Sequence, residues 1–412
     1  MKTFAIATLG CKVNSVESDR YIQIMEQGDY QQVDFKDKAD LYIINTCAVT
    51  NAAAAKSRQR IAQAQRLNPK AQIVVVGCSV AADFDNLSKF KNIEAFISQD
   101  EKADFDRIVL KKELMNTLAA TKQSKTRAFL KIQDGCEQFC SFCVIPIARG
   151  PETSVQLDEL VTTTQQLVAA GHQEIVLTGI HIGKYGMKDE SSLLELLKEL
   201  VCIDGLQRIR ISSIEITELH DDLLEFMANE PKIAKHLHIP LQSGSDVVLK
   251  AMNRPYDMAY FFKRVAKIRT LMPDIMISSD VIAGFVNESE AQFQETIANI
   301  EALDFGFLHV FPYSKRKQTK AMQMKHHLPG DVIKARTQTL LAVSKACRTK
   351  YYQSYVDKNV SVLLERHHKG GMFGYSEHYL PVVVKDYKCD GNQFVDVTIT
   401  HTTDTMCYGV LK

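Results

Sequence analysis

Three cysteines fall within one eight-residue stretch of the chain, Cys136-Glu137-Gln138-Phe139-Cys140-Ser141-Phe142-Cys143, which has the spacing C-x3-C-x2-C. Thiolates this close together can face a common point, and zinc or an iron–sulfur cluster is their natural partner. A structural zinc site needs four ligands, and the nearby sequence offers no fourth cysteine or histidine. The stretch therefore favours a three-cysteine iron–sulfur cluster. A zinc loop completed by a distant ligand and three unconnected buried cysteines are the alternatives.

The first eighty residues repeat one arrangement three times. Short apolar runs at 4–10, 41–46 and 73–77 end at Cys11, Cys47 and Cys78, with helix-like segments at 14–27 and 50–67 between them. This alternation predicts βαβ units and a parallel sheet. Because the carboxyl ends of parallel strands share one edge, we expect the three cysteines to converge there. They then form either a second three-cysteine site or three buried structural positions.

Strands and helices alternate again from 128 to 313. We expect strands at 128–132, 174–178, 207–212, 236–241, 275–281 and 307–311. Ser192-x-x-Glu195 and Thr153-x-x-Gln156 are capping-box patterns ahead of helices. Six βα repeats predict a partial TIM-like (β/α)6 barrel, in which reactive groups lie at the carboxyl ends of the strands. The cysteine loop follows the first of these strands.

The last part of the chain changes character. An amphipathic helix is expected at 330–355, and strands at 360–364, 380–384 and 394–400 predict a small β barrel. We read 80–125 as the tail of the first domain and a connector, with a polar linker at 118–127. The fold class is therefore α/β with three domains, at 1–120, 126–350 and 356–412.

Composition excludes several classes of protein. No apolar run approaches the roughly 18 residues of a membrane span, and the N-terminus reads as a strand rather than a signal peptide. Ten cysteines without an export signal indicate a reducing cytoplasm and metal binding rather than disulfides. The net charge of +1 gives no global attraction to nucleic acid, so RNA binding needs local basic patches. The run Lys315-Arg316-Lys317-Gln318-Thr319-Lys320 is either such a phosphate-binding patch or a solvated face.

The cysteine spacing, with Phe142 before the last cysteine, resembles that of the radical S-adenosylmethionine enzymes. The resemblance implies a 4Fe–4S cluster on Cys136, Cys140 and Cys143. Its open iron chelates S-adenosylmethionine, whose cleavage yields a 5′-deoxyadenosyl radical. It also implies the six-stranded partial barrel, in agreement with the strand pattern.

Three further motifs resemble the methylthiotransferase branch of that family, namely Thr8-Leu9-Gly10-Cys11-Lys12-Val13-Asn14, Asn45-Thr46-Cys47-Ala48-Val49-Thr50 and Gly77-Cys78. This resemblance implies a second 4Fe–4S cluster on Cys11, Cys47 and Cys78. It implies tRNA and an external electron donor such as flavodoxin or ferredoxin as partners, and an RNA-binding TRAM domain at 356–412. Aromatic and histidine side chains there either stack on bases or pack the barrel: His367, His368, Phe373, Tyr375, His378 and Tyr379.

The strand ends supply candidate contacts to S-adenosylmethionine. A glycine lets a ligand approach the backbone, hydroxyls suit a ribose, and Gln242 and Asp280 each interrupt or close an apolar strand. The resemblance implies that the adenine of the cofactor lies at the end of the fifth predicted strand. Together, the candidates are Phe142, Gly179, Ser212, Gln242, Asp280, Gly284 and Phe285. Solvated loop positions and helix caps are the alternative for the polar members. Arg149 either pairs with a carboxylate or forms a surface salt bridge.

Within the family, residues 8–14 and 309–316 most resemble the enzymes that methylthiolate carbon 2 of N6-threonylcarbamoyladenosine at position 37 of tRNA. The alternatives are isopentenyladenosine in tRNA, an aspartate of a ribosomal protein, or a non-catalytic cluster-containing RNA-binding protein. The chain departs from the family at Ile216, at Val286-Asn287 and at Gln318. These departures affect the shape of loops rather than the cluster motifs.

Overall fold

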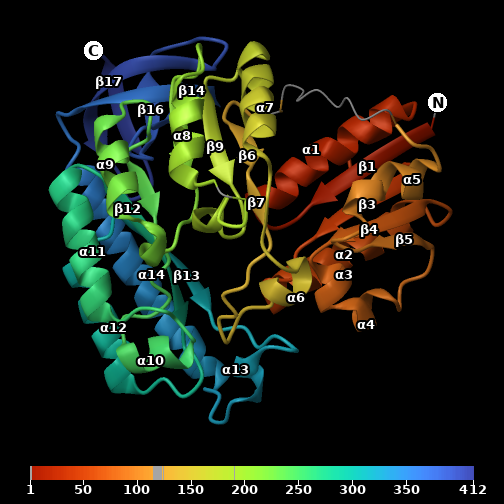
Figure 1. Ribbon diagram of the computed structural model, residues 1–412, viewed down its shortest axis with the longest axis horizontal. Coiled ribbons are helices and arrows are strands. Elements are labelled where there is room, and N and C mark those ends of the chain that lie inside the picture. The colour runs from red at the N-terminus through yellow and green to blue at the C-terminus, as the bar shows by residue number, and fades with distance from the viewer. Residues whose placement is uncertain (1, 115–122, 124, 190) are drawn as a thin grey trace. The chain divides into compact units, whose positions relative to one another are not determined.

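The structure is a computed structural model that describes residues 2–114, 123, 125–189 and 191–412 (Figure 1). The chain divides into two compact units. Unit 1 comprises Met1–Thr121, Gln133–Thr153 and Ser314–Gln323, and unit 2 comprises Lys122–Ile132, Ser154–Tyr313 and Met324–Lys412. The division into three domains at 1–120, 126–350 and 356–412 stays a prediction.

Unit 1 is built on a five-stranded parallel sheet with the order β2-β1-β3-β4-β5. Its strands are β1 (Lys2–Thr8), β2 (Tyr30–Gln32), β3 (Leu41–Thr46), β4 (Gln72–Gly77) and β5 (Ile93–Ile97). Its helices before residue 114 are α1 (Lys12–Gln27), α2 (Asn51–Leu67), α3 (Ser79–Ala82), α4 (Phe84–Leu87), the 3-10 turn η1 (Lys102–Asp104) and α5 (Phe105–Leu110). The predicted parallel βαβ arrangement is confirmed.

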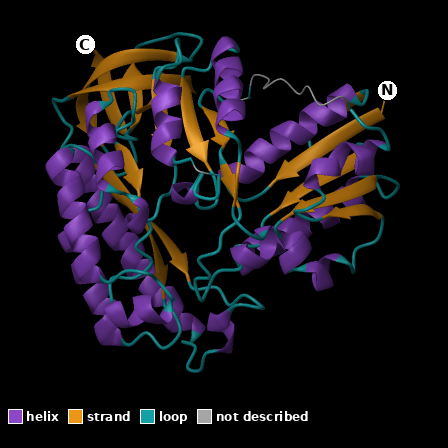
Figure 2. Cartoon of the chain, viewed as in Figure 1, coloured by secondary structure: helices purple, strands orange, loops and turns teal. Residues whose placement is uncertain are grey.

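Helices pack on both faces of this sheet (Figure 2). Every residue of β3 is buried, as expected for a strand covered on two sides. Tyr42 belongs to one apolar cluster with Ile61 of α2. Its neighbour Ile43 belongs to another with Tyr21 of α1. Side chains alternate across a strand, so the continuous apolar runs of the sequence supply a core on each side.

The interpretation of 80–125 as a tail and connector was wrong for the described part of that segment. It contains α4, η1, α5 and β5, the last of which completes the sheet beside β4. Phe105 of α5 stacks on Tyr21 with 4.2 Å between ring centroids. The predicted linker at 118–127 lies largely outside the described residues.

Unit 2 begins with six parallel strands, all close to their predicted positions. They are β6 (Ala128–Lys131), β9 (Glu174–Thr178), β10 (Arg208–Ile211), β11 (His236–His238), β12 (Met276–Ala283) and β13 (Phe307–Pro312). Two three-stranded sheets result, β10-β9-β6 and β11-β12-β13. Single parallel bridges, Ile209 to Ile233 and Ser213 to His238, connect them. The predicted α/β partial barrel is confirmed.

Helices follow the strands of this barrel along the chain. They are α7 (Leu157–Ala169), η2 (Ile182–Lys184), α8 (Leu193–Val201), η3 (Ile216–Glu218), α9 (Asp221–Asn229), α10 (Asp246–Ala251), α11 (Met258–Leu271), α12 (Glu290–Leu303) and α14 (Gly330–Gln353). Ser192 caps α8 as predicted, since its hydroxyl accepts a hydrogen bond from the Glu195 amide. The capping box at Thr153 was wrong, because Thr153 lies in the short strand β8 (Thr153–Ser154) and α7 begins after Gln156. The other short elements are β7 (Gln133–Asp134), α6 (Ile145–Arg149) and α13 (Lys320–Gln323).

The C-terminal segment of unit 2 is a closed five-stranded barrel with the order β14-β15-β16-β18-β17. The strands are β14 (Asn359–His368), β15 (Gly371–Ser376), β16 (Pro381–Lys385), β17 (Gln393–Thr402) and β18 (Cys407–Leu411). The predicted small β barrel is confirmed, although β15 and β18 were not anticipated.

Buried charges join the two barrels of unit 2. Glu174 on β9 pairs with Arg210, whose Nε lies 2.9 Å from Glu174 Oε1, and with Arg208. Arg208 and Arg210 in turn donate to the Ser361 and Ser376 carbonyl oxygens, each at 2.9 Å.

Within the part of the chain that the structure describes, no helix is long and apolar enough to cross a membrane.

Candidate functional site

The three N-terminal cysteines follow three neighbouring strands of unit 1. Cys11 comes after β1 at the start of α1, Cys47 directly follows β3, and Cys78 directly follows β4 and starts α3. Cys11 is exposed, whereas Cys47 and Cys78 are buried. Since β1, β3 and β4 are adjacent and parallel, the three residues meet at the carboxyl edge of the sheet.

Close backbone packing brings these cysteines together. A side-chain carbon on Gly10, whose φ is +99°, would lie 2.9 Å from Cβ and 3.0 Å from Sγ of Cys47. Only glycine accepts both this conformation and this approach. Asn14 donates hydrogen bonds to the Leu9 carbonyl at 2.7 Å and to the Thr46 carbonyl at 2.9 Å. It therefore ties together the two strand ends that carry Cys11 and Cys47.

The thiols also affect one another electrostatically. Burial raises the pKa of the Cys47 thiol, and the charges of Cys78 and Cys11 raise it further. Burial also raises the pKa of the Cys78 thiol, against the opposing charges of Arg149 and Lys102. A metal centre must therefore displace protons from these two thiols on binding.

The second cysteine set, Cys136, Cys140 and Cys143, lies on the loop between β7 and α6, also in unit 1. All three are half-buried. The Cys143 amide donates to the Cys140 carbonyl at 3.0 Å, and the Cys136 amide donates to the Gly150 carbonyl at 3.2 Å. Phe142 lies on this loop, where its contact with S-adenosylmethionine stays a prediction. The loop thus holds three thiols within eight residues beside a fixed helix.

The elements that follow the two cysteine sets pack against each other. Helix α6, two residues after Cys143, and helix α3, directly after Cys78, share one apolar cluster. Its members are Ala48, Cys78, Ala82, Val144 and Ala148. Elements next to both sets of cysteines therefore share one apolar cluster within unit 1.

Arg149, the last residue of α6, is the hub of a buried polar network. Its guanidinium lies 2.9 Å from Asp134, which precedes Cys136, and 3.2 Å from Glu17 of α1. It also donates to Asn14 Oδ1, and its positive charge opposes the rise that burial causes in the pKa of the Cys78 thiol. The side chain is fully inaccessible to solvent. Arg149 therefore contacts segments next to both cysteine sets, and the alternative of a surface salt bridge was wrong.

The charge of Arg149 is secured by its surroundings. Burial alone lowers its pKa, but the charges of Cys78, Glu17 and Asp134 outweigh burial and raise it. Glu17 has a second cation, Lys102, at 2.8 Å. The sequence did not reveal Asn14, Glu17 or Lys102 as parts of the site. Only the position of Asn14 in the first cysteine motif hinted at a role.

The basic run at 315–320 contains one buried cation, Arg316, and three exposed ones, Lys315, Lys317 and Lys320. Arg316 is buried, and its Nη1 donates to Asn51 Oδ1 at 2.6 Å. The Lys315 carbonyl accepts a hydrogen bond from Asn51 Nδ2. The Ser141 carbonyl in the second cysteine loop accepts from the Ala321 amide at 2.7 Å. The segment thus supports the cysteine loop, and the choice between a phosphate-binding patch and a solvated face stays a prediction for its exposed lysines.

In unit 2, the predicted cofactor contacts gather at strand ends. Gly179 follows β9 and Ser212 follows β10, where its amide donates to the Leu177 carbonyl at 3.2 Å. Gln242 has a φ of 64° and forms a parallel bridge to Val281. The carboxyl edge of this barrel therefore carries the polar side chains that sequence reasoning placed there, and their contact with a cofactor stays a prediction.

Gly284 and Phe285 have structural partners. A side-chain carbon on Gly284 would lie 2.8 Å from Cγ1 of Ile333 on α14. Phe285 is fully buried and packs edge-on against Tyr313, with 5.3 Å between the ring centroids. Packing alone accounts for both residues, and a role in holding a cofactor stays a prediction.

Asp280 lies in a group of three residues on neighbouring strands whose side chains could bind a metal ion. The other two are His238 of β11 and His309 of β13, and one ligand atom from each of the three lies within 4.8 Å of the others. His238 Nε2 is 3.1 Å from Asp280 Oδ1, and its Nδ1 is 2.8 Å from the Ser278 hydroxyl. Phe307 and Phe311 flank the exposed His309 on the same strand. This wall of the barrel offers both hydrogen-bonding groups and rings that suit a flat polar ligand.

Two sequence profiles match the chain. Residues 3–98 match "Uncharacterized protein family UPF0004", and residues 130–300 match the "Radical SAM superfamily". The first match contains Cys11, Cys47 and Cys78, and the second contains Cys136, Cys140 and Cys143.

Named relatives match nearly the whole chain. The threonylcarbamoyladenosine tRNA methylthiotransferase MtaB of Bacillus subtilis is 39% identical over 410 residues, covering 93% of this chain and 91% of its own. The tRNA-2-methylthio-N(6)-dimethylallyladenosine synthase of Endomicrobium trichonymphae is 32% identical over 373 residues, covering 88% of each chain.

The fold is similar to that of a solved radical S-adenosylmethionine methyltransferase, TsrM from Kitasatospora setae, whose structure contains cobalamin and a 4Fe-4S cluster. The TM-score is 0.59 at 13% identity, over 77% of this chain and 76% of the other. At this identity the similarity concerns the fold alone.

Proposed function

The chain belongs to the family of radical S-adenosylmethionine tRNA methylthiotransferases, and from this premise we propose that it methylthiolates carbon 2 of N6-threonylcarbamoyladenosine at position 37 of tRNA. The observation that carries the proposal is its identity, over nearly its full length, with the Bacillus subtilis threonylcarbamoyladenosine enzyme. The product is the 2-methylthio derivative of that nucleoside, next to the anticodon.

The two cysteine sets fit two 4Fe–4S clusters. Each set offers three cysteine thiols, and thiolates are the usual ligands of such clusters. We assign one cluster to Cys136, Cys140 and Cys143 and the other to the N-terminal three. When bound, the first cluster with S-adenosylmethionine supplies the radical that removes hydrogen from the substrate, and the second holds the sulfur to be transferred. An external electron donor, such as flavodoxin or ferredoxin, and a cytoplasmic location complete the proposal.

The protein's own contribution in unit 1 is to position these thiols and balance their charge. Arg149 places a permanent cation beside Cys78 and bonds to segments next to both cysteine sets. Thiolates in a buried site need such a compensating charge. Arg149 and Lys102 therefore favour the deprotonated, metal-binding state of Cys78, and the bonds of Arg149 to Glu17 and Asp134 hold the neighbouring segments in place.

In unit 2, Gly179, Ser212 and Gln242 beyond the strand ends and Asp280 within β12 are the proposed contacts for S-adenosylmethionine and the nucleoside. Polar groups at this edge orient ligands in α/β barrels. The closed barrel at 359–411 is the proposed TRAM domain that binds the RNA.

Nucleoside analysis tests this function. Expression of the chain in a bacterium that lacks its own threonylcarbamoyladenosine methylthiotransferase should restore 2-methylthio-N6-threonylcarbamoyladenosine, measured by mass spectrometry of digested tRNA. Cys136→Ala should abolish deoxyadenosine formation from S-adenosylmethionine. Cys11→Ala should retain that cleavage and lose the methylthio product. A methylthio product from Cys11→Ala would refute the two-site assignment.

A second candidate substrate is N6-dimethylallyladenosine in tRNA. Relatives named for it share 32–33% identity with this chain, less than the 39% of the threonylcarbamoyladenosine enzyme. In a strain that lacks both activities, appearance of the 2-methylthio-dimethylallyl nucleoside alone would favour this candidate.

A further inference from the structure

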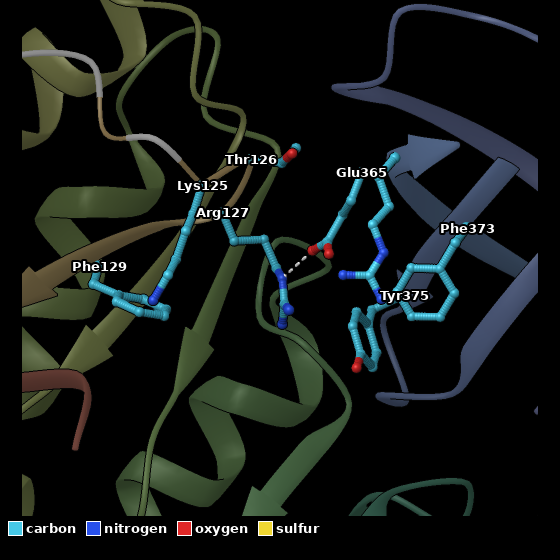
Figure 3. Close-up of a pocket in the computed structure, with 8 residues that line it drawn as sticks. Lys125, Thr126, Arg127, Phe129, Glu365, Phe373 and Tyr375 are labelled. Atoms are coloured by element: carbon cyan, nitrogen blue, oxygen red, sulfur yellow. Dashed lines mark hydrogen bonds and ion pairs between the residues drawn. The ribbon is translucent and has the colours of Figure 1, made fainter. Parts of the chain in front are cut away.

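A hollow in unit 2, with a volume of about 380 Å³, lies between the residues that lead into β6 and two strands of the C-terminal barrel (Figure 3). Lys125, Arg127 and Phe129 form one side, and residues of β14 and β15 form the other. We call this hollow the cation–aromatic pocket. Its size is within the roughly 300–1,000 Å³ of small-molecule sites, which suits a single nucleotide.

Each aromatic ring of the pocket carries a cation on its face. Lys125 Nζ lies 4.3 Å from the Phe129 ring centre. The guanidinium carbon of Arg127 lies 4.4 Å from the Tyr375 ring centre, and that of Arg366 lies 4.7 Å from the Phe373 ring centre. Such contacts hold the cations in place. A ligand therefore meets preorganised charges and spends little entropy in ordering them.

The pocket has a surplus of positive charge. Its lining contains three cations, Lys125, Arg127 and Arg366, and one carboxylate, Glu365. Arg127 neutralises that carboxylate, since its Nε lies 2.5 Å from Glu365 Oε1 (Figure 3). Three cations less one carboxylate leave two positive charges among the lining residues. Packing between the two barrels would need neither this surplus nor the hollow, whereas an anionic ligand accounts for both.

The pocket lies away from the site of chemistry. Lys125 and Arg127 precede β6, so they stand at the amino ends of the parallel strands. The proposed contacts Gly179 and Ser212 stand at the carboxyl ends. A five-residue strand such as β9 spans about 17 Å at 3.3 Å per residue. An occupant of the pocket is therefore not the nucleoside that reacts.

We propose that the cation–aromatic pocket binds one unstacked nucleotide of the tRNA, remote from the modified adenosine. Its phosphate contacts Lys125 and Arg366, and its base stacks on the guanidinium planes that lie over the rings. Single-stranded RNA is recognised through such planes and cations. The inference rests on the proposed function, because it takes tRNA as the substrate.

The test compares two double variants. The pocket variant carries Lys125→Gln and Arg366→Gln. The control variant carries Lys198→Gln and Lys263→Gln, which remove two exposed charges from the outer helices α8 and α11. Binding of an unmodified tRNA transcript is measured at several salt concentrations. The pocket variant should bind about tenfold more weakly. The magnitude of the slope of log K against log salt should fall by about 0.7, because the contact with one phosphate of a single strand is lost. The control should bind like the parent. The KM of the pocket variant for tRNA should be raised. Its kcat, measured at saturating tRNA, should be unchanged.

A reporter variant guards against an indirect effect of loosened packing. The chain has no tryptophan, so Phe129→Trp introduces a single one in the pocket. A uridine hexanucleotide should quench its fluorescence, and Lys125→Gln, Arg366→Gln should remove the quenching. Equal affinity of the pocket variant and the parent, or an unquenched tryptophan, overturns the proposal. Neither result touches methylthiolation by the parent protein, whereas a parent that binds no tRNA refutes the proposed function itself.

Discussion

Replacement of Arg149 by methionine should strongly destabilise unit 1. The change removes a fully buried guanidinium that faces Glu17 and Asp134, and loss of one partner of a buried ion pair costs roughly 3–5 kcal/mol. Glu17 keeps Lys102 at 2.8 Å, and Asp134 keeps the Gln99 amide at 2.8 Å. Partial compensation places the expected loss near the lower end, at about 3 kcal/mol. Set against a total of roughly 5–15 kcal/mol for a typical domain, this is a large fraction.

Urea unfolding of the metal-free protein, followed by circular dichroism under anaerobic conditions, measures this loss. Arg107→Met is the matched control in the same unit. Arg107 also pairs with two carboxylates, those of Asp104 and Glu113, but its side chain is 56% exposed. Exposed ion pairs contribute little, so the control should unfold like the parent. Iron and sulfide analysis after reconstitution should show a lower cluster content only for Arg149→Met.

A double-mutant cycle makes the reasoning refutable. Glu17→Gln removes one of the charges that Arg149→Met leaves behind, so the double variant should lose less stability than the sum of the single variants. Strict additivity would show that Arg149 and Glu17 do not interact. A transition for Arg149→Met that coincides with that of Arg107→Met would show that the buried network contributes nothing to stability.

Two further changes have defined outcomes. Gly10→Ala should displace Cys47, because the new carbon would lie 2.9 Å from Cys47 Cβ at a φ of +99°; iron content should fall, while Gly330→Ala, at a position with open space, should bind iron normally. His378 should make stability depend on pH, since burial lowers its pKa below the ordinary 6.5 despite the charges of Glu377 and Asp274. The unfolded chain then binds the extra proton, so this stability is complete above about pH 6.5 and is lost as pH falls. His378→Gln should flatten the fall in Tm between pH 7 and pH 5 relative to the parent.

Each of these two predictions has a result that would contradict it. Normal iron binding by Gly10→Ala would mean that the loop relaxes without moving the Cys47 thiol. An identical pH dependence of Tm for His378→Gln and the parent would mean that other groups control acid unfolding of unit 2. The slope at issue is at most about 1.4 kcal/mol per pH unit for one proton, which thermal scans at closely spaced pH values resolve.

In the sheet of unit 1, the sequence predicted the interior strands well and the edge strands poorly, for a physical reason. Strands β3 and β4 lie inside the sheet and carry continuous apolar runs that must be buried on both faces. Strands β2 and β5 are the edges of the same sheet. β2 has only three residues, mostly exposed, and β5 includes an exposed Glu94. Edge strands need less apolar surface and are kept short or charged, so their sequences resemble loops.

In the candidate site, too, the sequence predicted the features formed by residues close together in the chain and missed those formed by residues far apart. The spacing of Cys136, Cys140 and Cys143 is readable because the ligands lie on one short loop. The partner of Arg149 in α1, Glu17, lies 132 positions away, and no local pattern announces such a pairing. Charge pairs are predictable from sequence mainly at three or four residues' separation on a helix. The burial that turned Arg149 from a surface residue into the hub of the network follows from the packing of α6 on α3.

The path of the chain explains why this network matters for function. After β6 in unit 2 the chain enters unit 1, forms the second cysteine loop and α6, and returns to unit 2 at Ser154. Both cysteine sets are therefore held by one core, through the apolar cluster of α3 and α6 and through Arg149. Packed cores resist continuous deformation, so the spacing of the two sets is fixed independently of unit 2, which carries the proposed contacts for S-adenosylmethionine and RNA. A reaction that passes sulfur from one cluster site to a carbon activated at the other needs this constancy, because small errors in the position of reacting groups cost orders of magnitude in rate.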